Sequence, residues 1–144
     1  MPRWLRSVLA IVLGLVVGSV VNMGLVTLGG KLVAPPAGAD VTTMEGLKAS
    51  MHLFEARHFL FPFLAHALGT LAGALVAGLL APGPSPTPAY AVGGLFLLGG
   101  IASVFMLPAP VWFSVVDLLL AYLPAAWLGQ ALAVRARHAR ARGA

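Results

Sequence analysis

The sequence predicts an all-α membrane protein, a four-transmembrane-helix bundle with an outer interfacial helix, that forms one domain over residues 1–144. Hydrophobic residues make up 60% of the chain and charged residues only 9%, whereas a soluble domain has about 25% charged residues. Four long apolar stretches account for most of the chain. Composition and pattern together exclude a soluble globular enzyme, a disordered tail and a coiled coil.

Each apolar stretch is long enough to cross a bilayer as a helix, because the hydrocarbon core requires about 20 apolar residues. The four expected spans are residues 7–30, 59–82, 89–107 and 111–134. The apolar part of the first span is longer than the about 7–15 residues of a signal peptide, so we expect this helix to be retained. The only His, Asp, Glu, Lys or Arg residues inside the four spans are His66 and Asp117.

Basic residues gather at the two ends of the chain, beside the first and last spans. The six terminal arginines are Arg3, Arg6, Arg135, Arg137, Arg140 and Arg142. By the positive-inside rule both termini are cytoplasmic, and an even number of spans agrees with this orientation. The formal net charge of +5 therefore indicates contact with anionic lipid of the bilayer, and we do not expect nucleic acid as a partner.

The longest connection, residues 31–58, lies on the outer side in this topology. The sequence Thr42-Thr43-Met44-Glu45 fits a capping box, in which the Thr42 hydroxyl and the Glu45 carboxylate satisfy the first free amides of a helix. We expect that helix to run along the membrane interface and to continue, or kink at Pro62, into the second span. The cytoplasmic connection, residues 81–88, has alternate prolines and cannot be helical.

One face of each expected span consists of small or polar residues, which let helix backbones approach closely in lipid. The first span carries a GxxxGxxxN pattern, and on the fourth the residues Ser114, Asp117, Ala121 and Pro124 align. Helix packing is the expected role of the glycines. A bundle this small with glycine faces also predicts self-association or a partner membrane subunit.

Three polar residues on different spans share one expected depth. At about 1.5 Å per residue, Asn22, His66 and Asp117 all lie roughly 9–12 Å below the outer boundary. Each is also on the small face of its helix. Their common depth predicts a shared polar site that faces the outer side.

Asp117 is the most informative member of this group, because a buried acid costs about 2.5–3.5 kcal/mol on insertion scales. It has to be protonated, paired or hydrated, and His66 is the expected partner, since opposite charges favour both ionised forms. One interpretation is a proton relay, a metal ligand or a substrate contact. The other is a structural hydrogen bond between helices, which is worth about 0.6 kcal/mol on average.

Further histidines and acids precede the second span, and we expect them to line the entrance to the site: Glu45, His52, Glu55 and His58. The chain has no cysteine, so a metal site would use imidazole and carboxylate groups. His52, His58 and His66 are the candidate ligands of zinc or copper by ligand type. Their spacing matches no established ligand signature, so solvated interfacial histidines remain the alternative.

Residues 51–70, from Met51-His52-Leu53-Phe54 through His58-Phe59-Leu60-Phe61-Pro62-Phe63 to Leu68-Gly69-Thr70, resemble a recurring signature of an uncharacterised family of small four-helix bacterial inner-membrane proteins. The resemblance covers the outer helix and part of the second span. It implies a bacterial inner-membrane location and a fold, and it brings no activity with it.

These observations leave three functional interpretations open. The first is a small binding or transport-type protein in which His66 and Asp117 titrate and Asn22 is a fixed hydrogen-bonding group. The second is an accessory or structural subunit of a membrane complex, in which His66 and Asp117 merely pair. The third is a membrane enzyme acting on a lipid, quinone or peptide, with Glu45, Glu55 or His58 as acid or base.

Overall fold

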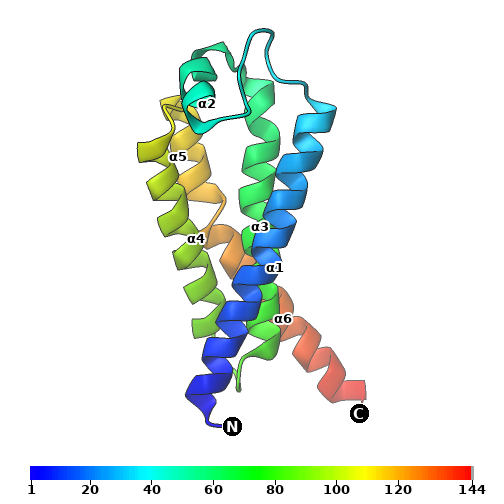
Figure 1. Cartoon of the computed structure of the whole chain (residues 1–144). Helices are drawn as coiled ribbons and strands as arrows, with labels where there is room; N and C mark the ends of the chain where they lie inside the picture. Colours follow the sequence, from blue (N-terminus) through cyan, green and yellow to red (C-terminus); the bar gives the residue numbers. More distant parts are fainter. Residues whose placement is uncertain (144) are drawn as a thin grey trace.

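The computed structural model describes residues 1–143, and every regular element in that range is helical (Figure 1). Four stretches are long and apolar enough to cross a membrane: Arg3–Leu32, Ala56–Leu80, Thr87–Met106 and Val111–Gly143. The predicted all-helical class and the four candidate spans are therefore confirmed for the described residues.

Helices α1 (Arg3–Leu32) and α3 (Leu60–Leu80) pack through facing glycines. A Cβ atom added at Gly14 would lie 2.6 Å from the carbonyl oxygen of Gly73, and one added at Gly18 would lie 2.7 Å from that of Gly69. Both distances are too short for real Cβ contacts. The two backbones thus touch directly, as the GxxxG spacing of the sequence predicts.

The central helix α3 also contacts α4 (Thr87–Met106) and α6 (Leu123–Gly143) (Figure 1). Small residues again set the distances between helices. A Cβ at Gly129 of α6 would lie 2.6 Å from the carbonyl oxygen of Leu71 in α3. Where α4 and α6 meet, a Cβ at Gly93 would lie 2.5 Å from the Cβ of Ala126.

The fourth candidate span is broken near its middle, which the sequence analysis did not predict. Helix α5 (Val111–Leu120) ends at a bend formed by Ala121 and Tyr122, and α6 starts at Leu123. The expectation of one uninterrupted helix over residues 111–134 was wrong. The physical reason is Pro124, which lacks an N–H group and cannot sit in the interior of a regular helix, but fits the first turn of a new one.

The outer segment also differs from the expectation. Helix α2 (Met44–Ser50) has Thr43, not Thr42, as its N-cap, since the Thr43 hydroxyl accepts the amide hydrogen of Gly46 at 2.9 Å. The helix does not continue into the second span. Two 3₁₀ turns, η1 (Met51–Leu53) and η2 (Ala56–Phe59), lead to α3 instead.

Asp40 closes the outer loop onto both ends of α2. Its carboxylate accepts hydrogen bonds from the Thr42 hydroxyl at 2.6 Å and the Thr42 amide at 2.8 Å. Its own amide donates to the Ser50 hydroxyl at 2.9 Å. The hydrogen bonds from Thr42, the side chain first, hold the pKa of the exposed Asp40 carboxyl below its usual value. These bonds close residues 40–50 into a loop around α2.

At the opposite end, Arg137 of α6 caps the C-terminus of α3. Its guanidinium donates to the carbonyl oxygens of Gly78 at 3.2 Å, Ala81 at 2.6 Å and Gly83 at 2.6 Å. The last carbonyls of a helix have no partner within the helix, and a cation at this end is also favoured by the helix dipole. Arg137 therefore joins α3, its following turn and α6.

Candidate functional site

His66 and Asp117, predicted as partners, are in direct contact. His66 lies on α3 and Asp117 on α5, and Nδ1 of the imidazole is 2.8 Å and 2.9 Å from the two carboxylate oxygens. The Asp117 residue is only 5% exposed. Because ionised carboxylate oxygens only accept, Nδ1 carries the hydrogen and Nε2 is the ring nitrogen left for another partner.

Tyr122 is a third member of the site that the sequence analysis missed. Its hydroxyl donates to Oδ2 of Asp117 at 3.0 Å, and its ring stacks on the His66 ring with centroids 5.7 Å apart. Tyr122 is 3% exposed and lies in the bend between α5 and α6. Gly100 makes room for it, since a Cβ there would be 2.5 Å from the tyrosine oxygen. The available signal was Pro124, which marks the bend that turns Tyr122 back toward Asp117.

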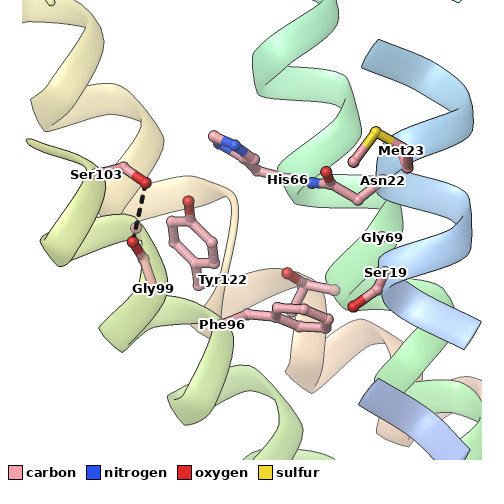
Figure 2. Close-up of a pocket in the computed structure, with 11 residues that line it drawn as sticks. Ser19, Asn22, Met23, His66, Gly69, Phe96, Gly99, Ser103 and Tyr122 are labelled. Atoms are coloured by element: carbon pink, nitrogen blue, oxygen red, sulfur yellow. Dashed lines mark hydrogen bonds between the residues drawn. The ribbon is translucent and has the colours of Figure 1, made fainter. Parts of the chain in front are cut away.

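A cavity of about 300 Å³, the inner cavity, lies beside this triad between α1, α3 and α4. Figure 2 shows His66 and Asn22 extending into the space that faces Tyr122 and α4. Its wall carries several hydroxyl and amide groups, and the polar lining residues are Ser19, Asn22, His66, Thr70, Ser103 and Tyr122. Polar groups thus form part of the wall of a cavity inside an apolar chain.

A second cavity of about 280 Å³, the outer cavity, lies between the triad and the outer segment. Its wall is mostly aromatic and aliphatic, and includes Met51, Phe54, Phe59, Phe113 and Leu107 together with His58, His66, Ser103, Ser114 and Asp117. The inner and outer cavities share His66, Gly100 and Ser103. His66 and its partner Asp117 therefore lie where the two cavities adjoin.

His58 is buried in the outer segment and is incompletely hydrogen-bonded. It is 9% exposed, and its Nδ1 accepts the backbone amide hydrogen of Glu55 at 2.9 Å. A backbone nitrogen always carries its hydrogen, so the ring hydrogen of a neutral His58 lies on Nε2. That buried nitrogen has no hydrogen-bond partner within residues 1–143. The hydroxyl of Thr70, on the inner cavity, is likewise unpartnered.

The other residues predicted for the site divide into two groups. Asn22 lines the inner cavity with His66, as their common depth suggested. Glu45, His52 and Glu55 are exposed, and none of them lines the inner or the outer cavity. Glu55 instead forms a surface ion pair with Arg57, with Nε 3.0 Å from Oε2.

The three histidines proposed as metal ligands are not brought together. Across residues 1–143, no three His, Asp or Glu side chains are grouped closely enough to hold a metal ion. The structure therefore does not group His52, His58 and His66, and a zinc or copper site at these residues stays a prediction. The reason is local, because His52 is exposed on η1, His58 uses Nδ1 to accept from Glu55, and His66 uses Nδ1 to bind Asp117.

The site offers a buried Asp–His–Tyr group with one open ring nitrogen, at the boundary between the inner and the outer cavity. Within the described residues, no serine, threonine or lysine side chain hydrogen-bonds to His66, so no activated nucleophile accompanies the imidazole. The chemistry that the group can perform is hydrogen bonding and proton exchange at Nε2.

Comparisons of the chain with models of protein families, with curated proteins and with solved structures gave no match.

Proposed function

We propose that the chain is a multi-pass protein of the bacterial inner membrane, folded as a four-helix bundle with both termini in the cytoplasm. The four apolar stretches support membrane insertion. The two termini lie at one end of the molecule and α2 at the other (Figure 1). The six arginines of the termini thus share one end, whereas the opposite segment has three basic residues and three acids, whose charges balance.

Within that protein, the site binds a small ligand from the outer side, as in a binding or transport-type protein. The observation that carries this proposal is the buried carboxylate of Asp117, held by His66 and Tyr122 at a break in a candidate span and bordered by two cavities. Broken helices inside a membrane are tolerated where they line a cavity, and in transporters they form the substrate site.

Proton exchange with the ligand follows from the open nitrogen of His66. When the imidazole is protonated, the His66–Asp117 pair is neutral overall and Nε2 is a donor. When the imidazole is neutral, Nε2 offers a lone pair instead. A ligand at Nε2 therefore binds differently to the two protonation states, which couples its binding to a proton.

The accessory-subunit interpretation accounts for less of this arrangement. A pair that only joins two helices needs no space around it, since buried polar groups in cores are normally enclosed by packed atoms. Here His66 lines both cavities. The unpartnered hydroxyl of Thr70 on the inner cavity is a further group that a ligand or water would satisfy.

The proposal is tested by thiol labelling, for which the chain is naturally suited because it contains no cysteine. Ser103 and Leu98 are both exposed residues of α4, but only Ser103 lines the two cavities. In intact cells, Ser103→Cys should react with a membrane-impermeant methanethiosulfonate at least roughly tenfold faster than Leu98→Cys, because only a hydrated thiol ionises to the reactive thiolate.

Equal, slow labelling of Ser103→Cys and Leu98→Cys would show that no water reaches the cavities from outside. That result would overturn the outward-facing site and favour the accessory-subunit interpretation. Faster labelling of Ser103→Cys supports the proposal. The purified variant should show the same fast labelling and the same size-exclusion elution volume as the unchanged protein.

A further inference from the structure

We infer that the ligand of the outer cavity is a neutral, membrane-soluble ring compound that carries carbonyl oxygens, the chemical class of the quinones. This inference rests on the proposed function, because it names the ligand class of the same site. Four features of the cavity carry it: its aromatic wall, its two imidazole donors, its charge balance and its opening.

The wall of the outer cavity suits a flat ring. The rings of Phe54, Phe59 and Phe113 all line it. Phe59 and Phe113 lie with centroids 4.7 Å apart and an interplanar angle of 39°, and Phe54 is tilted against Phe59 at 6.2 Å. Such rings contact another aromatic ring favourably by its face or its edge. A volume of about 280 Å³ is at the small end of ligand pockets, which fits a ring headgroup.

Two imidazole side chains from different elements line this cavity. His58 of η2 carries its ring hydrogen on Nε2, and that nitrogen is buried without a partner. An unpaired buried donor is costly, so its presence points to an acceptor that is supplied on binding. In its imidazolium form, His66 of α3 donates to Asp117 through Nδ1 and keeps the hydrogen on Nε2 for a second acceptor. Two carbonyl oxygens on one ring match two such donors.

The charge balance of the cavity favours a neutral ligand. No lysine or arginine lines it, and Asp117 is its only acid. That carboxylate already accepts from His66 and Tyr122. An anionic headgroup would therefore lack a free cation, and a cationic one would lack a free anion, which makes burying either of them expensive.

The opening of the cavity suits a compound dissolved in the membrane. Val26 of α1 and Val104 of α4 both line the cavity, yet they are 43% and 38% exposed. The opening therefore lies between α1 and α4, which diverge toward the α2 end (Figure 1). A ligand of the outer leaflet reaches the cavity through that side without passing the loop closed by Asp40.

The test is an NMR titration of the full chain labelled with ¹⁵N-histidine in detergent micelles. The chain has only four histidines, so His52 and His138, both exposed, serve as internal controls. The probe is 2-methyl-1,4-naphthoquinone, since the chain has no cysteine thiol, the group that adds fastest to such a quinone, and its control is 2-methylnaphthalene. We expect the quinone to shift the Nε2 signals of His58 and His66 and to leave those of His52 and His138 unchanged.

Two substitutions at His58 test the Nε2 donor separately from the hydrogen bond that Nδ1 accepts from the Glu55 amide. In His58→Asn the amide oxygen takes the place of Nδ1 and keeps the bond from Glu55, but the donor at Nε2 is lost. In His58→Gln the amide nitrogen takes the place of Nε2 and keeps the donor. We expect the apparent Kd of the quinone to rise about tenfold in His58→Asn, as for one lost hydrogen bond, and to change much less in His58→Gln.

Equal shifts with 2-methylnaphthalene would overturn the inference, because the cavity would then recognise an apolar shape without the carbonyls. An absence of shifts with both compounds would also overturn it. In that case, rapid external labelling of Ser103→Cys would still support the proposed function, so the two failures are distinguishable.

Discussion

Asp117 accepts hydrogen bonds from two side chains, one on a neighbouring helix and one in the helix break. His66 approaches from α3, and Tyr122 follows five residues later in the chain. The depth of His66 and Asp117 in their spans was sufficient to predict that these two residues meet. The contribution of Tyr122 could not be predicted in the same way, because its direction depends on the bend at Ala121 and Tyr122. The burial of His58 depends in turn on the 3₁₀ turns that replace the expected helix.

Removing the Tyr122 hydroxyl isolates its contribution to the site. Tyr122→Phe should lower the free energy of unfolding by about 0.6 kcal/mol, the average for a side-chain hydrogen bond between membrane helices. The measurement is reversible unfolding by sodium dodecyl sulfate in mixed micelles. Tyr90→Phe is the matched control, since Tyr90 is the other tyrosine of the chain and is exposed. Equal stability of the two variants would contradict a stabilising bond from Tyr122 to Asp117.

At the scale of the elements, hydropathy predicted where the four candidate spans lie, and the glycine spacing predicted that α1 packs through Gly14 and Gly18. Both follow from local sequence, because span length and small-residue faces are properties of one helix at a time. The break in the fourth span was missed because Pro124 was assigned to the small face of a continuous helix. The N-cap of α2 was misplaced by one residue because two threonines are adjacent in the sequence. The hydroxyl of Thr42 donates to Asp40, so Thr43 caps the helix.

A single added methyl group tests the glycine contact. In Gly18→Ala the new Cβ would lie 2.7 Å from the Gly69 carbonyl oxygen and from the Phe96 ring. We expect a loss of about 1–3 kcal/mol of unfolding free energy, the usual cost of overpacking, measured by the same detergent unfolding. Gly24→Ala on the same helix meets nothing within 4 Å and should show no loss. If both variants were equally stable, the backbones of α1 and α3 would not be in contact.

The whole molecule is polarised by charge. The terminal arginines lie at one end, and α2 with its flanking loop lies at the other (Figure 1). The sequence alone suggested this arrangement, because the positive-inside rule depends only on counting basic residues beside each span. The packing of the spans, and with it the inner and outer cavities, could not be predicted by counting charged or apolar residues. Cavities arise where the side chains of neighbouring helices leave space between them.

The proposed orientation predicts which ends are accessible from outside the cell. Ala49→Cys, exposed on α2, should react in intact cells with an impermeant maleimide. Ser85→Cys, exposed in the turn between α3 and α4, should react only after the membrane is permeabilised. The reverse pattern would contradict the proposal that both termini are cytoplasmic.

The contacts of Arg137 have a mechanical consequence for the site. They clamp α6 to α3 and to the turn that follows α3, whereas α5 is joined to α6 only through the bend at Ala121 and Tyr122. A rotation of α5 about that bend would separate Asp117 from His66 while α6 stays held against α3. Such a motion would widen the outer cavity and leave the contacts at the end that holds the termini unchanged.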